Sequence, residues 1–131
     1  MISGGCACGD VQYKGTGEPG FSFLCQCRSC QRVTGSGHLA QFMYPLQDLT
    51  VSGPAASWTR PASTGNTVTK FYCATCASPL YGRASIAPDN AMITAGSLDN
   101  PDIFKPAKIL FSEEATHWDH PSLSDNNGAT K

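Results

Sequence analysis

Three thiols lie within six residues in the stretch Cys25-Gln26-Cys27-Arg28-Ser29-Cys30. Two cysteine pairs flank it, Cys6-Ala7-Cys8 and Cys73-Ala74-Thr75-Cys76, and they complete the seven cysteines of the chain. An odd number of cysteines cannot all pair as disulfides within one chain, and the first residues lack the basic and apolar regions of a secretory signal. We therefore expect a cytoplasmic protein with reduced thiols. Reduced thiols this closely spaced indicate metal ligands.

The two outer pairs each supply half of a metal site. Structural zinc takes four donors at tetrahedral corners, with Zn–S distances of about 2.3 Å. A Cys-x-Cys pair on an extended segment presents both side chains on one face, and a Cys-x-x-Cys pair in a tight turn converges its sulfurs. We expect one closed structural zinc site that clips distant segments together, made of Cys6, Cys8, Cys73 and Cys76.

The middle group differs because its three thiols can all reach one ion. Cys25, Cys27 and Cys30 would leave the fourth coordination position open, which is the arrangement of a catalytic zinc. The sequence therefore predicts two zinc ions per chain.

Three alternatives remain beside this interpretation. Cys73 and Cys76 would suit a dithiol redox pair, although the βαβ context of that motif is missing. All seven thiols would serve as buried structural residues, although scattered core cysteines do not cluster at chelating spacings. A histidine would close the middle site and make it structural, the candidates being His38, His117 and His120.

Length and composition indicate one small all-β domain. The chain has 131 residues, of which 13 are glycine and 9 are proline, so we expect frequent turns and no long helices. The expected strands are 11–13, 21–24, 39–44, 67–72 and 92–94, with a short helix over 28–33. We expect the domain to span 1–120 and a mobile tail to span 121–131. A net charge of -1 argues against nucleic acid as a partner, and no apolar run is long enough for a membrane span.

The cysteine groups and their flanking residues resemble one family, the glutathione-dependent formaldehyde-activating enzymes (GFA), which also includes the centromere protein V domain. The resemblance runs from Gly4 to about Pro121. It is carried in order by Ser3-Gly4-Gly5-Cys6-Ala7-Cys8-Gly9-Asp10-Val11-Gln12-Tyr13, Cys25-Gln26-Cys27-Arg28-Ser29-Cys30-Gln31-Arg32-Val33-Thr34-Gly35, Phe71-Tyr72-Cys73-Ala74-Thr75-Cys76-Ala77-Ser78-Pro79-Leu80 and Ala95-Gly96-Ser97-Leu98-Asp99.

The resemblance implies a small zinc-bound β-tent fold of short antiparallel sheets, with a structural zinc on the outer cysteines and an active-site zinc on the middle ones. Two positions depart from the family pattern. Gln26 stands where the family commonly has a histidine, which removes a titratable group beside the active zinc. Ala77 stands where the family commonly has glycine, in a turn that favours positive φ.

The resemblance also implies a carbon–sulfur lyase that acts on a thiol adduct such as S-hydroxymethylglutathione, with glutathione as the candidate thiol partner. Three thiolates make zinc soft and electron-rich, so activation of a bound thiol is favoured over polarisation of a carbonyl. Arg28 and Arg32 are four residues apart on the expected helix and are candidate contacts for a substrate carboxylate. The alternative is a zinc-binding module or glutathione carrier without catalysis. The sequence does not determine the oligomeric state.

Overall fold

The structure is a computed structural model that describes residues 1–62 and 65–123. Within these residues the chain forms ten strands, one α-helix and four 3-10 helices. The strands are β1 (Ile2–Gly5), β2 (Gln12–Gly15), β3 (Ser22–Cys25), β4 (Leu39–Pro45), β5 (Leu49–Ser52), β6 (Ala55–Pro61), β7 (Thr67–Cys73), β8 (Pro79–Ala84), β9 (Asn90–Thr94) and β10 (Lys108–Leu110). The α-helix is α1 (Arg28–Thr34), and the 3-10 helices span Leu46–Asp48, Ala95–Ser97, Pro101–Ile103 and Ser112–Glu114. The expected tail, 121–131, lies outside the described residues from 124 onward.

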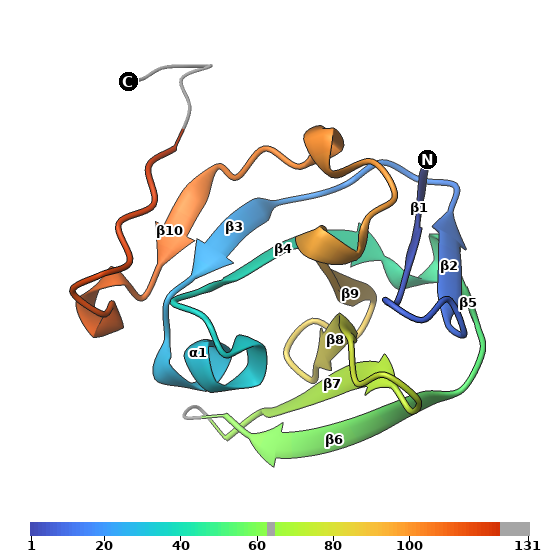
Figure 1. The fold of residues 1–131 in the computed structure, drawn as a ribbon, viewed down its shortest axis with the longest axis horizontal. Helices are drawn as coiled ribbons and strands as arrows, with labels where there is room; N and C mark the ends of the chain where they lie inside the picture. Colours follow the sequence, from blue (N-terminus) through green and yellow to red (C-terminus); the bar gives the residue numbers. More distant parts are fainter. Residues whose placement is uncertain (63–64, 124–131) are drawn as a thin grey trace.

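The strands form two sheets, a small one and a large curved one (Figure 1). The small sheet has the order β1-β2-β5, and the large sheet has the order β10-β3-β4-β9-β8-β7-β6. All pairs are antiparallel except β10 with β3, which is parallel. A parallel pair needs a long crossover connection, and the chain reaches β10 only after returning from β9. The all-β expectation is confirmed, with this parallel pair as the exception to antiparallel pairing.

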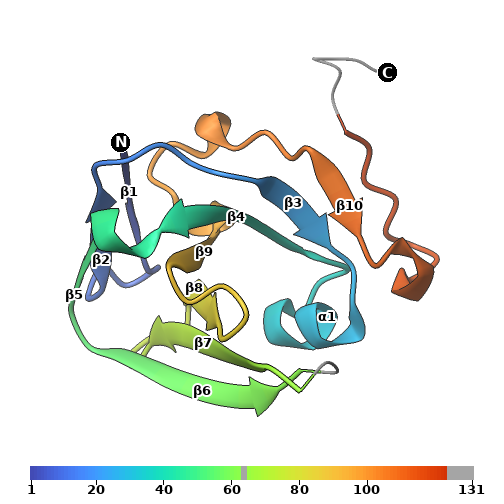
Figure 2. The same cartoon turned by 180° about the vertical axis from the view of Figure 1, so that it is seen from behind.

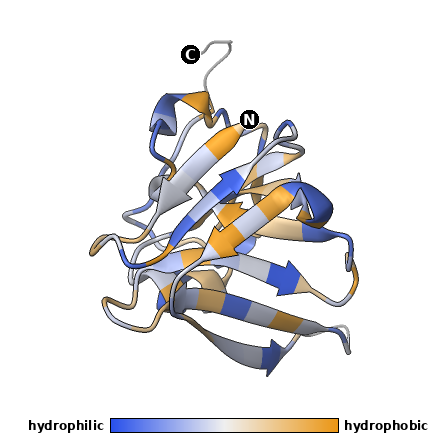
Figure 3. Ribbon diagram, turned by 90° about the vertical axis from the view of Figure 1, so that its right-hand side faces the viewer, coloured by the Kyte–Doolittle hydropathy of each residue, from blue (hydrophilic) through white to orange (hydrophobic). Residues whose placement is uncertain are grey.

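The main core joins the two sheets. Side chains of the small sheet pack in one cluster with side chains of β4, β8 and β9. The largest fully buried members are Tyr13, Phe42, Tyr44, Leu80 and Ile93. Figure 3 shows hydrophobic and hydrophilic residues following one another in short intervals along the strands, as expected for strands with one buried face. The outer thiol Cys73 belongs to this core and is fully buried.

Helix α1 lies beside the ends of β3 and β4, with β6 and β7 on its other side, in both opposite views (Figures 1 and 2). The expected helix over 28–33 agrees with it to within one residue. At seven residues it is too short to be stable alone, so its ends are fixed by specific contacts. Cys27 caps the N-terminus in an extended conformation, and Gly35 ends the helix at φ 69. No helix among the described residues has the length and apolar character needed to cross a membrane.

Candidate metal centres

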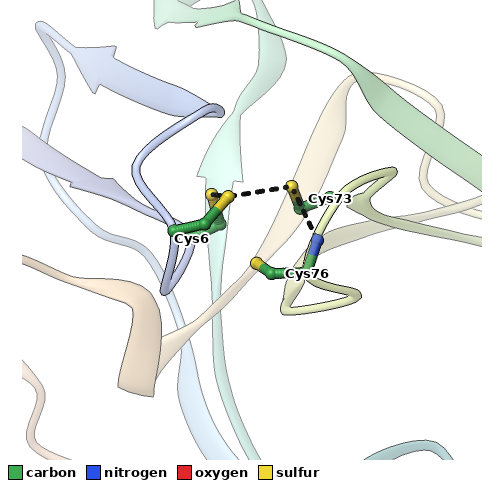
Figure 4. A group of neighbouring side chains, drawn as sticks. Cys6, Cys73 and Cys76 are labelled. Atoms are coloured by element: carbon green, nitrogen blue, oxygen red, sulfur yellow. Dashed lines mark hydrogen bonds between the residues drawn. The ribbon is translucent and has the colours of Figure 1, made fainter.

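The fold brings the four outer cysteines together from two different sheets. Cys6 and Cys8 follow β1, whereas Cys73 ends β7 and Cys76 lies in the turn after it. All four sulfurs lie within 4.8 Å of one another. The Cys6 and Cys8 sulfurs are 3.6 Å apart, and those of Cys8 and Cys73 are 3.7 Å apart. These separations match the roughly 3.8 Å between corners of a zinc–thiolate tetrahedron. Figure 4 shows the sulfurs of Cys6, Cys73 and Cys76 converging on one point.

Hydrogen bonds from the turns around these sulfurs favour their ionised form. The Val11 N–H donates to Cys6 Sγ at 3.2 Å, and the Thr75 N–H donates to Cys73 Sγ at 3.3 Å. The Ser78 hydroxyl, followed by backbone N–H groups, lowers the pKa of Cys76 to about 5. The cluster is therefore prepared to hold thiolates.

Four thiolates cannot accumulate here without a cation. The Asp10 N–H lowers the pKa of Cys8, but desolvation and the neighbouring sulfurs of Cys6, Cys76 and Cys73 outweigh it and raise the pKa to about 12. A divalent ion removes this repulsion, so the donor chemistry of the cluster fits zinc.

The three middle thiols also meet, because a strand end and a helix start lie next to each other. Cys25 is the last residue of β3, Cys27 is the N-cap of α1, and Cys30 lies in the first turn of the helix. Their sulfurs all lie within 4.8 Å of one another. Cys25 and Cys30 are 5% and 4% exposed, whereas Cys27 is only half-buried. Access from solvent is therefore on the Cys27 side of the cluster.

No histidine or carboxylate joins these three sulfurs among the described residues. Hydrogen bonding from the Cys30 thiol lowers the pKa of Cys25 to about 6, while the same contact and burial raise the pKa of Cys30. One thiol thus ionises at the expense of its neighbour, and a divalent ion allows all three to ionise. The cluster fits a metal ion bound by three thiolates.

Lys70 of β7 faces the middle cluster. Burial lowers the pKa of its ammonium group, while the charges of Cys30 and Cys25 act in the opposite direction. The nearby Arg60 adds to the lowering. A cation next to three thiolates offsets part of their charge.

Gln26 stands between Cys25 and Cys27 and connects this segment to the C-terminal part of the chain. It is 3% exposed, and its Nε2 donates to Asp119 Oδ2 at 2.9 Å. His38 Nδ1 lies 2.9 Å from the same carboxylate oxygen. Burial alone raises the pKa of Asp119, but the hydrogen bonds from Gln26 and His38 outweigh it and leave the pKa below its ordinary value of 3.8. His38 therefore pairs with a carboxylate and does not lie with the three sulfurs.

The remaining predicted side chains do not belong to either group of candidate metal ligands. His117 and His120 are exposed and join neither thiol cluster. Arg28 Nη1 donates to Gln31 Oε1 at 2.8 Å. Arg32 lines a cavity of about 360 Å³ between α1 and the large sheet.

The sequence alone did not point to Lys70, Arg60 or Asp119. Lys70 and Arg60 lie on the paired strands β7 and β6, where Trp58 stands opposite Lys70 and Arg60 stands opposite Val68. Asp119 reaches Gln26 across 93 positions of sequence. Because side chains alternate along a strand, the sequence could have placed Trp58 and Arg60 on one face. Which residues that face meets depends on how the strands pair.

Comparisons with known proteins agree with this geometry. Residues 1–114 match the family model described as "Glutathione-dependent formaldehyde-activating enzyme". A search of curated protein sequences finds no match. Among solved structures, the crystal structure of a Rhodobacter sphaeroides protein is similar with a TM-score of 0.64 at 20% identity, over 82% of this chain and 99% of that one. That likeness concerns the fold, whereas the family model covers most of the sequence and all seven cysteines. The chain belongs to the glutathione-dependent formaldehyde-activating enzyme family.

Proposed function

We propose that the protein is a zinc-dependent carbon–sulfur lyase-type enzyme that forms or breaks the bond between a thiol and a small aldehyde. The observation that carries this proposal is the middle cluster, where three sulfurs lie within 4.8 Å of one another and no fourth side-chain ligand accompanies them among the residues that the structure describes. S-hydroxymethylglutathione is the adduct that the family description suggests.

Zinc held by Cys25, Cys27 and Cys30 would supply a coordination position at which a substrate thiol loses its proton near neutral pH. In the synthetic direction the substrate sulfur forms a bond to the aldehyde carbon. The carbonyl π electrons move to oxygen, which takes up the proton that the thiol released. The reverse sequence breaks the same carbon–sulfur bond.

The chain's own residues give this site its direction of access and its charge. Burial of Cys25 and Cys30 closes one side, and the half-buried Cys27 leaves the other side open. Lys70 places positive charge beside the thiolates, which stabilises an additional anionic sulfur. The outer cluster of Cys6, Cys8, Cys73 and Cys76 holds a structural zinc in this proposal, because its four sulfurs already fill a tetrahedron.

Metal content and adduct exchange test the proposal in two matched variants. The wild type is expected to hold two zinc equivalents, one for each cluster, and to accelerate exchange between glutathione, formaldehyde and their adduct in an NMR exchange experiment. Cys27→Ser is expected to lose one equivalent and to fall to the uncatalysed rate. The double variant Cys6→Ser/Cys8→Ser, which leaves the outer cluster only two thiols, should lose the other equivalent and keep turnover at a temperature at which it stays folded.

Two results contradict the proposal. If Cys27→Ser retains both metal equivalents, the middle cluster is no metal site. If zinc-replete wild type binds glutathione tightly but never exceeds the uncatalysed rate, the chain is a carrier of thiols.

A further inference from the structure

A cavity of about 360 Å³ lies between α1 and the face of the large sheet formed by β6, β7 and β8. Ser29, Arg32 and Val33 line it from one face of the helix, as positions three and four apart do. Ser29 is placed between the ligand candidates Cys27 and Cys30, and the lining residue Leu39 packs against Cys25 and Cys30. The cavity therefore adjoins the middle cluster.

Among the described residues, the cavity is lined by three cations and by no acidic residue. Arg32, Arg60 and Lys70 all belong to its lining. Within the described part of the chain the ion pairs are Met1–Glu18 and His38–Asp119, so no carboxylate neutralises these three groups. The Nε of Arg60 is buried without a hydrogen-bond partner there, and its Nη1 reaches only the Pro61 carbonyl, at 3.4 Å. A buried donor without a partner is costly unless something else accepts from it.

The middle cluster does not account for all of this charge. Three thiolates around one Zn²⁺ carry a net charge of about −1, which a single cation such as Lys70 offsets. If Lys70 balances that charge, Arg32 and Arg60 remain without a balancing anion. Arg60 and Lys70 also repel each other. The excess indicates an anionic ligand.

Most of the remaining lining is apolar and partly aromatic. On β6 and β7, Trp58 stands directly opposite Lys70, and Tyr72 lies two residues further along the same face. Trp58 is 52% exposed, which is unusual for a side chain with so much apolar surface. Pro79 and Val33 complete an apolar wall. Such a wall suits a flat apolar group better than a long polar peptide.

We propose that this cavity binds a small molecule with one carboxylate and a flat apolar body, the carboxylate lying among Arg32, Arg60 and Lys70 and the body lying against Trp58. Together with the proposed function, on which this step rests, the cavity assigns a substrate class to the enzyme. That class is an aromatic or similarly flat thiol that carries a carboxylate.

Binding of simple probes tests the cavity independently of catalysis. The probes are phenylacetate, its neutral analogue phenylacetamide, and acetate, which lacks the apolar body. Trp118→Phe leaves Trp58 as the single tryptophan, so its fluorescence reports occupancy of the cavity. Phenylacetate is expected to bind about tenfold or more tightly than either analogue.

Substitutions identify the groups that hold the carboxylate. Arg60→Gln and Lys70→Met are each expected to weaken phenylacetate binding about tenfold while leaving phenylacetamide unchanged. Arg83→Gln is the matched control, because Arg83 is an exposed arginine of the same sheet that lies outside the cavity lining. Zinc content is measured for each variant, since Lys70 also influences the thiols.

The outcomes separate this inference from the proposed function. Equal binding of phenylacetate and phenylacetamide, or unchanged binding in Arg60→Gln, overturns the assignment of the cavity even if glutathione adducts turn over. If phenylacetate binds as expected but zinc-replete protein accelerates neither glutathione nor 4-mercaptophenylacetate addition to formaldehyde, the proposed function fails and the binding site stands. Faster addition of 4-mercaptophenylacetate than of glutathione supports both.

Discussion

Ala77 has a backbone conformation that alanine rarely adopts. Its φ is 66, and its N–H donates to the Cys73 carbonyl at 2.9 Å to close the turn that carries Cys76. The resemblance to the family, which commonly has glycine here, predicted a turn with positive φ, and the structure confirms that conformation. A Cβ in the left-handed region costs about 1–2 kcal/mol, which exceeds the entropy cost of glycine. We expect Ala77→Gly to raise the free energy of unfolding of zinc-replete protein by about 1 kcal/mol in urea denaturation.

Ala74→Gly is the control in the same turn. Ala74 is exposed and its φ is not positive, so glycine there should destabilise the fold slightly. Equal effects of the two substitutions would show that strain at Ala77 is not what limits the turn.

Asp119 offers a test of the contact made by Gln26. Because folding lowers its pKa, the carboxylate contributes stability above its ordinary value of 3.8, and this stability is lost as the pH falls through the folded-state pKa. Removing the donor in Gln26→Leu should raise the Asp119 pKa, as followed by carboxyl chemical shifts in an NMR titration. Gln41→Leu, at a buried glutamine that makes no hydrogen bond to Asp119, should leave the pKa unchanged. An unaltered pKa in Gln26→Leu would assign the lowering to His38 alone.

For individual residues, the sequence predicted those contacts that follow from the spacing of residues along the chain. The three middle thiols lie within six residues, so their grouping follows from local geometry, and the fold brings them together. Asp119 was not foreseen, because its contact with Gln26 depends on where the C-terminal segment runs. No periodicity or motif encodes such a contact.

Helix α1 depends on one buried side chain for its position. Gln31 Nε2 donates to the Gln26 carbonyl at 2.9 Å and to the Glu114 carbonyl at 3.0 Å, so it joins the helix to the segment that carries Cys25 and Cys27 and to the C-terminal segment. Gln31→Leu leaves these carbonyls without that donor, which should cost about 1–3 kcal/mol and loosen the loop that presents Cys27. We expect faster transfer of one of the two zinc equivalents to a chelator, measured by stopped flow. Gln47→Leu, at an exposed glutamine remote from α1, should leave both rates unchanged.

Some strands were predicted from the sequence and others were not, because only some of them bury apolar residues at regular positions. β4 and β9 bury apolar residues at regular positions and were expected from their sequence. β6 has no regular apolar face, and it is bounded by Pro54 and Pro61, so it was not expected. Proline is tolerated there because β6 is an edge strand. Since β6 carries Trp58 and Arg60, the cavity beside the middle cluster could not be predicted either.

The outer cysteines connect parts of the whole molecule that are far apart in sequence. Cys8 and Cys73 are separated by 65 residues, and their sulfurs are 3.7 Å apart. A cross-link that closes such a loop restricts the unfolded chain by about 4 kcal/mol. The double variant Cys6→Ser/Cys8→Ser removes both thiols on the N-terminal side of this loop, and neither residue is buried. We expect this variant to lower the free energy of unfolding by about 4 kcal/mol, measured by urea denaturation at fixed free zinc.

Cys27→Ser is the comparison, because the middle ligands enclose a loop of only six residues. The same estimate for such a short loop gives about 2 kcal/mol, so the outer site should stabilise the fold more than the middle one. The opposite ranking would mean that the middle metal, and not the outer one, contributes more to the stability of the fold.

The different spans of the two clusters also bear on how the protein is made. A chain growing on the ribosome contains every middle ligand once residue 30 has been added, but it lacks Cys76 until more than half of its length exists. During synthesis the three thiols of the middle cluster are therefore complete first, and the four thiols of the outer cluster only later. A nascent polypeptide halted at residue 60 therefore carries all three thiols of the middle cluster but only two of the four outer ones.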